Sequence, residues 1–153
     1  MTVDPYQRVA AIIRNARGDV LVVQHRPDGA QFWTCPGGLV NEGESLSYAL
    51  RRSVSHEIGL QIRIGNIACI GEVTLARSER RRIEVFFWVE PCGAREYAAH
   101  IAWMTPDDLT ALFSPAVVLD AIARGAHGAY LGNITDRSRA LPAQRNASRR
   151  VRI

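Results

Sequence analysis

The sequence predicts an α+β fold, in which helices cover a mixed β-sheet. The segment 45–58 has the clearest helical pattern in the chain, because apolar residues recur at every fourth position. Runs of β-branched and aromatic residues precede and follow it, and they do not alternate simply with helices. This arrangement implies a mixed sheet covered by helices. At 153 residues, the chain has the length of one domain with a substantial core.

The first elements predict a β-hairpin. The runs 8–14 and 20–25 are apolar and β-branched, and a glycine-containing turn at 15–19 separates them. The turn residues 27–29, Pro-Asp-Gly, should end the second strand. The next segment, 32–38, predicts a strand that breaks into a Pro-Gly-Gly loop shortly before the helix.

Helix 45–58 has an apolar stripe and a polar edge. The stripe is formed by residues at every fourth position: Leu46, Leu50, Val54 and Ile58. Gly59 follows where a helix should end. Ser53, His56 and Glu57 lie along one edge of the stripe, which should face the Pro-Gly-Gly loop. Glycine-rich backbone approaches ligands closely and helix N-termini favour anions, so this junction indicates a phosphate or metal site.

The second half of the chain predicts two strands and two further helices. The runs 67–76 and 83–90 predict strands joined by a polar turn. The second run, IEVFFWVE, is dense in aromatic and β-branched residues and should be central. A short strand at 102–104 precedes a helix start at Thr105-Pro106. Ser114-Pro115 repeats this signal ahead of a helix that continues to about Ala123.

Residues 1–130 should form the domain, and residues 131–153 should form a disordered, arginine-rich tail. The tail has six arginines against Asp136 alone, so the rest of the chain is nearly neutral. Such a tail could contact nucleic acid or anionic surfaces. It has no interleaved aromatic residues and no folded platform, so a solubilising role is favoured and a nucleic-acid partner is not expected.

Composition argues against several other classes of protein. The mean hydropathy of −0.07 and the lack of a run of about 18 apolar residues argue against a membrane protein. Residues 1–8 do not resemble a secretion signal. The three cysteines are widely spaced, which favours reduced thiols and a cytoplasmic location. The chain contains no lysine, which excludes an amine nucleophile from that residue.

Residues 38–60, GLVNEGESLSYALRRSVSHEIGL, resemble the Nudix box, G-x5-E-x7-R-E-U-x-E-E-x-G-U, in which U is bulky and aliphatic. Seven positions match without insertion: Gly38, Glu44, Arg52, Val54, Glu57, Gly59 and Leu60. The preceding Trp-x-x-Pro-Gly-Gly and the segment 103–109 are also similar to the family, so the likeness covers about residues 8–123. It implies the Nudix fold, an α/β/α sandwich, and hydrolysis of a small phosphorylated substrate. Dimers are common in the family, so a homodimer is a further possibility.

Two positions depart from the family pattern, because Ser53 and His56 stand where the family has glutamates. In the family these glutamates, with the one matching Glu57, bind divalent metal. Mg²⁺ or Mn²⁺ neutralises the anionic diphosphate and lowers the pKa of bound water. Since magnesium prefers oxygen ligands, a single remaining carboxylate implies weak or altered metal dependence, or none.

Other ligands would then have to complete a metal site. The resemblance implies that the carbonyl of Gly38 contributes, as similar loops in the family do. It also implies a loop acid, for which Glu96 is the candidate. Glu79 and Glu84 compete with Glu96 for this role.

The candidate catalytic residues are Glu57, His56, Arg52 and Glu44. His56 has three interpretations: a ligand for a softer metal such as manganese, cobalt or zinc, an acid–base group near neutral pH, or a solvated helix residue. Ser53 is expected to be a small substitute and not a nucleophile, since no base partner is evident. By resemblance, Glu44 and Arg52 form an ion pair that ties the loop to the helix.

Three residues are candidate substrate contacts. Arg77 and Arg82 belong to an arginine cluster that could grip a phosphate or carboxylate, although a solvated hairpin tip is the alternative. Trp33 could stack on a nucleobase, or it could pack in the core.

Three functions follow as hypotheses. The first is a Nudix-type hydrolase of a diphosphate linked to a nucleoside or related moiety. The second is a degenerate domain that binds a nucleotide-like ligand without hydrolysing it. The third is a pathway-specific enzyme in which His56 acts without metal.

Overall fold

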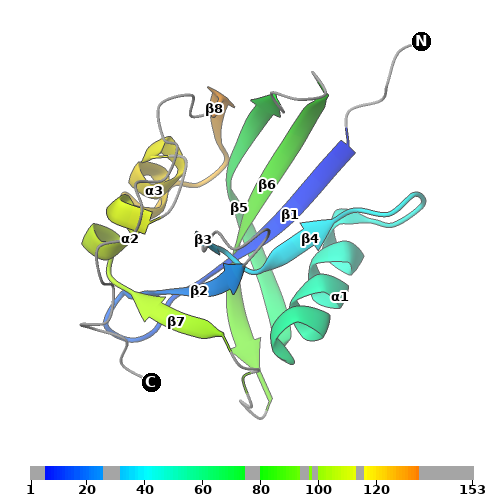
Figure 1. The fold of residues 1–153 in the computed structure, drawn as a ribbon. Helices are drawn as coiled ribbons and strands as arrows, with labels where there is room; N and C mark the ends of the chain where they lie inside the picture. Colours follow the sequence, from blue (N-terminus) through cyan, green and yellow to red (C-terminus); the bar gives the residue numbers. More distant parts are fainter. Residues whose placement is uncertain are drawn as a thin grey trace.

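The computed structural model describes residues 6–25, 32–74, 80–93, 97, 100–112 and 116–134. Their strands form a five-stranded sheet in the order β4-β1-β6-β5-β8 and a three-stranded sheet in the order β3-β2-β7 (Figure 1). The elements follow one another as β1 (Tyr6–Ile13), β2 (Val20–His25), β3 (Phe32–Thr34), β4 (Gly37–Leu39), α1 (Leu46–Ile58), β5 (Gln61–Thr74), β6 (Arg81–Cys92), β7 (Ile101–Met104), α2 (Pro106–Leu112), α3 (Ala116–Ala123) and β8 (Ala129–Asn133).

The five-stranded sheet is mixed, as predicted. β1 runs parallel to β6 and antiparallel to β4, whereas β5 runs parallel to β8 and antiparallel to β6. The IEVFFWVE run lies in β6, the middle strand, which confirms the prediction for this segment. Because β6 is paired on both edges and packed on both faces, aromatic and β-branched side chains suit it.

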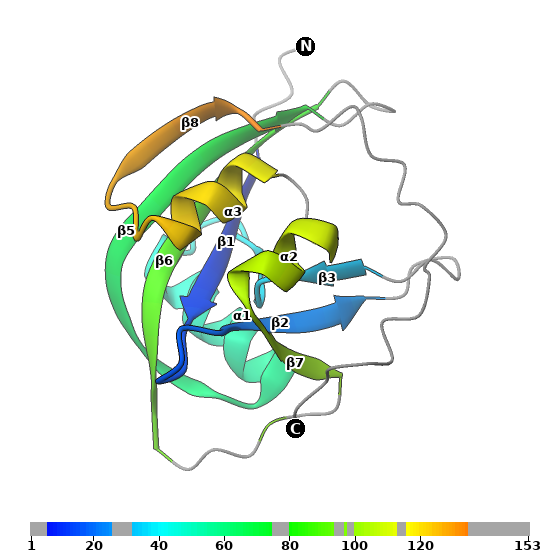
Figure 2. The same cartoon turned by 90° about the vertical axis from the view of Figure 1, so that its left-hand side faces the viewer.

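Helices lie on both faces of this sheet, which confirms the α/β/α arrangement. On one face, Val9, Ala11 and Ile13 pack in a core cluster with the apolar stripe of α1. On the other, Ala10 and Ile12 belong to a second cluster with apolar residues of α2 and α3. Figure 2 looks onto α2 and α3, with α1 behind the sheet. The alternation along β1 thus sends successive side chains into two different cores.

The predicted hairpin of the first two strands is wrong. β1 and β2 belong to different sheets, and only an isolated bridge between Arg14 and Val20 joins them. The edges of β1 are taken by β4 and β6, so β2 pairs instead with β3 and β7. The turn chemistry itself is as expected, because the Asn15 side-chain oxygen accepts hydrogen bonds from the N–H groups of Arg17 and Asp19.

The predicted Pro-Gly-Gly loop is a short edge strand. In β4, Gly37 lies opposite Ala10 and Gly38 lies opposite Val9, in antiparallel pairing with β1. A Cβ atom at Gly37 would collide with the carbonyl oxygen of Val9. This glycine is therefore required by the close approach of two backbones, and not by a loose turn.

Helix α1 begins and ends as the sequence predicts. Ser45 caps its N-terminus by accepting a hydrogen bond from the Tyr48 N–H at 3.1 Å. Gly59 ends it in the left-handed region, with φ of 68°, and its N–H donates to the Ser55 carbonyl. α2 starts in the predicted way, since the Thr105 hydroxyl accepts from the Asp108 N–H at 3.1 Å. No helix within the described ranges is long and apolar enough to cross a membrane.

The folded part extends beyond the predicted boundary at residue 130. β8 pairs with β5, and Ile134 beyond it is only 2% exposed. Ile134 occupies the space that a side chain at Gly71 would need. The AYLGN sequence of β8 is a weak strand pattern, so its pairing with β5 determines the conformation. Residues 135–153 of the predicted tail lie outside the described residues.

Candidate functional site at the junction of β4 and α1

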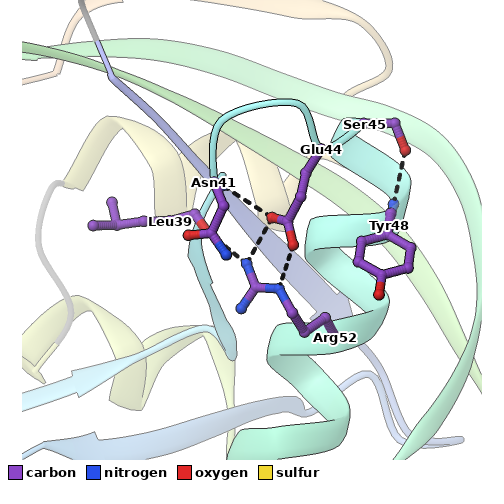
Figure 3. Close-up of polar contacts among 6 residues, drawn as sticks. All are labelled: Leu39, Asn41, Glu44, Ser45, Tyr48 and Arg52. Carbon is purple, nitrogen blue, oxygen red and sulfur yellow. Dashed lines mark hydrogen bonds and ion pairs between the residues drawn. The ribbon is translucent and has the colours of Figure 1, made fainter.

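Glu44 and Arg52 form the expected ion pair (Figure 3). Arg52 Nε donates to Glu44 Oε1 at 2.6 Å, and Nη2 donates to Oε2 at 2.8 Å. The same guanidinium donates to the Leu39 carbonyl, and the Asn41 N–H donates to Glu44. The hydrogen bonds from Arg52 and then Asn41 lower the pKa of Glu44 from 4.5 to about 2. The pair ties the end of β4 to the middle of α1.

Glu57 lies in the last turn of α1 and points at the start of β4. Its Oε2 accepts a hydrogen bond from the Gly37 N–H at 2.9 Å. Its Oε1 lies 3.3 Å from His25 Nε2, and the side chain is 18% exposed. The same His25 nitrogen lies 2.9 Å from the Thr34 hydroxyl. Residues of β2 and β4 thus contact one carboxylate of α1 that water still reaches, and β3 contacts the same histidine through Thr34.

Ser53 and Gly38 pack directly against one another. A Cβ atom at Gly38 would lie 2.5 Å from Ser53 Oγ and 3.1 Å from Ser53 Cβ. Ser53 is 6% exposed, and its Oγ has no hydrogen-bond partner in the part of the chain that the structure describes. The hydroxyl therefore fills space beside β4, in agreement with its interpretation as a small substitute.

Of the other side chains predicted as metal ligands, the structure describes His56 and Glu84. His56 is exposed in the last turn of α1. Glu96 and Glu79 lie outside the described residues. Glu84, the third candidate loop acid, is a residue of β6, is 6% exposed and forms an ion pair with Arg82.

Two of the three predicted substrate contacts can be located. Arg82, expected in a turn, is the second residue of β6, and its side chain lies 6.0 Å from the ring of Tyr6. Its Nε is buried and lacks a hydrogen-bond partner among residues that the structure places. Trp33 in β3 is partly buried against the core that faces α2 and α3. Arg77 lies outside the described residues.

Sequence reasoning missed His25, Thr34 and the amide of Gly37. His25 is the last residue of an apolar strand, VLVVQH, and looked like the polar end of that strand. Thr34 ends β3 and lies opposite Val23. The pairing of β2 with β3 brings Thr34 beside His25, and the fold brings His25 to Glu57; no local pattern reports either contact. The buried Cys35 next to them has its pKa raised to about 12, mainly by burial, so its thiol is protonated and unreactive.

A family model of the NUDIX domain matches residues 5–121. The chain belongs to the Nudix family. Among solved structures, it is similar to the MutT protein from Methanosarcina mazei Go1, with 25% identity and a TM-score of 0.62 over 81% of this chain and 96% of that one. It is also similar in fold to a NUDIX hydrolase from Nitrosomonas europaea, with 22% identity and a TM-score of 0.69 over 82% of this chain and 93% of that one.

A curated relative matches over a short segment only. An 8-oxo-dGTP diphosphatase from Buchnera aphidicola subsp. Schizaphis graminum (strain Sg) is 52% identical over 31 residues, which are 20% of this chain and 24% of that protein. The match thus spans about a quarter of the relative's length.

The described part of this Nudix domain fits magnesium poorly. No group of three or more His, Cys, Asp and Glu side chains gathers anywhere in it. Ser53 provides a buried hydroxyl where the family has a carboxylate, and His56 is exposed. Of the three family glutamates that bind metal, this chain keeps the one that matches Glu57, and both oxygens of its carboxylate already have partners. Magnesium is held through carboxylate and other oxygen ligands, which this arrangement supplies sparingly.

Proposed function

We propose that the chain is a Nudix-type hydrolase that cleaves a diphosphate linked to a nucleoside or a related moiety, with weak or altered metal dependence. The observation that carries the proposal is Glu57, a partly exposed carboxylate that Gly37 and His25 hold at the junction of β4 and α1. The ion pair of Glu44 and Arg52 braces the same junction. The name of the Buchnera relative supports a nucleoside diphosphate linkage as the target.

Glu57 would act on the water that attacks phosphorus. A carboxylate in hydrogen-bond reach of water can take its proton as the new phosphorus–oxygen bond forms. The bridging phosphorus–oxygen bond of the diphosphate breaks in the same displacement, and the other phosphate group leaves as an anion. A divalent cation, when bound, would neutralise charge on the diphosphate and lower the pKa of that water. The amide hydrogen bond from Gly37 fixes the orientation of the carboxylate, so little reorganisation is needed during the reaction.

Arg82 and Trp33 would hold the substrate. The Arg82 guanidinium pairs with Glu84, and its Nε, which has no hydrogen-bond partner among the described residues, is a donor for an anionic oxygen of the substrate. Arg8 adds a second guanidinium on the neighbouring strand, where it donates to the Cys35 carbonyl. Arg77 is proposed for the same role.

A cytoplasmic location, a homodimer and a solubilising tail are further proposals about the whole chain.

The experiment is a hydrolysis assay with a panel of nucleoside diphosphate derivatives, with magnesium or manganese. Glu57→Gln should lower kcat by about 10²-fold or more, because it removes the base. Glu90→Gln is the matched control, since Glu90 is an exposed glutamate on β6 that pairs with Arg63. Equal activity in the two variants, or no turnover of any compound by the unaltered chain, would remove the proposal.

The second candidate is a domain that binds a nucleotide-like ligand without hydrolysing it. The observation that favours it is Ser53, a buried residue that stands where the family has a metal-binding glutamate. Calorimetry that shows binding of a compound that is not turned over would support this function. A metal-dependent rate of hydrolysis would refute this second candidate.

The third hypothesis, an enzyme in which His56 acts without metal, requires activity that survives EDTA and is lost in His56→Ala.

A further inference from the structure

We propose that Tyr6, Arg80 and Arg82 form a subsite for a phosphate group of the substrate that is separate from the cleaved diphosphate. The inference rests on the proposed function, because it names a further feature of the same substrate. Binding at the subsite is measured without hydrolysis, so the two proposals can fail independently.

The register of β1 and β6 brings the side chains of the subsite together. These strands are parallel neighbours, and Tyr6 lies opposite Arg82 (Figure 1). Because side chains alternate along a strand, Tyr6 shares a face with Ala10, and Arg82 shares it with Phe86. The centre of the Tyr6 ring lies 5.0 Å from the guanidinium carbon of Arg80 and 6.0 Å from that of Arg82. One aromatic ring thus holds two guanidinium groups next to each other.

Both arginines of the subsite retain donors for a ligand. Arg80 is exposed, and in the described part of the chain its guanidinium contacts the Tyr6 ring and no carboxylate. Arg82 pairs with Glu84 through Nη2, but its Nε is buried and has no hydrogen-bond partner in the same part of the chain. A buried N–H without an acceptor is destabilising, and native structures rarely leave one unpaired. An oxygen of a bound anion would supply the acceptor.

The charge around the subsite matches that of a phosphate group. Arg8 lies opposite Glu84 on the same face of the sheet. Three arginines, Arg8, Arg80 and Arg82, and the single glutamate leave a net charge of +2. A phosphate monoester has a charge of about −1.5 to −2 at pH 7, whereas a carboxylate has a single charge. Guanidinium groups also present planar pairs of N–H donors that suit phosphate oxygens.

Arg8 connects this region to the junction of β4 and α1. Its Nη2 donates to the Cys35 carbonyl at 3.2 Å. Cys35 lies two residues before Gly37, whose N–H binds the Glu57 carboxylate. A substrate held at both places therefore has a second phosphate group apart from the diphosphate that Glu57 faces. Free inorganic phosphate has the same chemistry, and the experiment distinguishes it from a phosphate of the substrate.

The test compares nucleotides that differ by one phosphate group. Adenosine 5′-diphosphate and its 2′-phosphate and 3′-phosphate derivatives are titrated by calorimetry into the full chain, in EDTA to limit turnover. One of the two derivatives should bind the unaltered protein about tenfold more tightly than adenosine 5′-diphosphate. The same derivative should shift the NMR signal of the Arg82 Nε–H, which adenosine 5′-diphosphate should leave in place. Arg80→Gln and Tyr6→Leu should each remove most of the gain in affinity.

Arg81→Gln is the matched control for the loss of charge. Arg81 is the neighbouring arginine, and it donates to Glu72 at 2.6 Å. Its replacement removes the same charge from the same strand, so the tenfold gain should persist. Tyr6→Phe keeps the aromatic ring and should also keep the gain. Thermal unfolding of each variant reports whether the protein still folds.

The outcomes separate the two proposals. Equal gains in Arg80→Gln and Arg81→Gln would overturn the subsite, as would an Arg82 Nε–H signal that moves with neither derivative. A signal that moves with inorganic phosphate alone would assign the region to the free anion and overturn its role in substrate binding. A gain that depends on Arg80 in a chain that hydrolyses nothing would keep the subsite and remove the hydrolase. Hydrolysis whose KM values for the three nucleotides keep their ratio in Arg80→Gln would keep the hydrolase and remove the subsite.

Discussion

Ser53→Ala should stabilise the protein, because the Ser53 hydroxyl is buried without a partner in the described structure. The residue is 6% exposed in the middle of α1, against Gly38. A buried polar group without a hydrogen bond costs about 1–3 kcal/mol, and alanine exceeds serine in helix propensity by about 0.5 kcal/mol. The small void left by one oxygen offsets about 1 kcal/mol of this gain. We expect a net stabilisation of about 1 kcal/mol, or roughly 2–4 °C in Tm.

Urea denaturation followed by circular dichroism measures this change, and Ser55→Ala is the matched control. Ser55 is exposed on the same helix, so its replacement changes helix propensity without removing a buried hydroxyl. The urea midpoint of Ser53→Ala should exceed that of Ser55→Ala, with an unchanged denaturant slope. A Ser53→Ala protein that is less stable than Ser55→Ala would show that the hydroxyl has a partner, and the interpretation of Ser53 as a packing substitute would be wrong.

Three further predictions concern the same junction. Gly37→Ala should destabilise the protein by about 3 kcal/mol or more, seen as a lower urea midpoint, because its Cβ would meet the backbone of Val9. The pKa of Glu44 is lowered to about 2 in the folded state, so its charge stabilises the fold above its ordinary pKa of 4.5 and this contribution is lost as the pH falls toward 2. Denaturation curves of Glu44→Gln and the unaltered chain should therefore differ most at neutral pH and converge in acid. Ser53→Glu combined with His56→Glu should raise magnesium-dependent hydrolysis at least about tenfold in the proposed assay, since it adds the oxygen ligands that magnesium prefers; an unchanged rate would count against a pocket built for metal.

The sequence predicted the elements whose signals are local. Helix α1 has its cap at Ser45, its stop at Gly59 and an apolar stripe between them, and each of these features depends on residues within one or two turns. The central position of β6 followed from its aromatic and β-branched composition. The ion pair of Glu44 with Arg52 came from family resemblance, and the structure shows its geometry.

What the sequence could not predict depends on pairing between distant segments. Turn residues between β1 and β2 are compatible with a hairpin, but β4 and β6 occupy both edges of β1. Gly37 was expected in a loop, because glycine composition alone does not tell a turn from a close backbone approach. The contact between His25 and Glu57 joins residues 32 positions apart in sequence, one at the end of β2 and the other in the last turn of α1. Periodicity carries no information on such contacts.

Glu57 has a structural and a chemical role, and the two make different demands on the side chain. Its Oε2 accepts the Gly37 N–H, and any suitably placed oxygen can do this. A base or a cation ligand instead needs the negative charge. Glutamine keeps the carbonyl oxygen and removes the charge, so Glu57→Gln should preserve the junction of β4 and α1 while it lowers kcat by about 10²-fold or more. A variant that is stable but inactive therefore assigns the lost activity to the charge of the carboxylate, whereas a variant that unfolds assigns Glu57 to the fold.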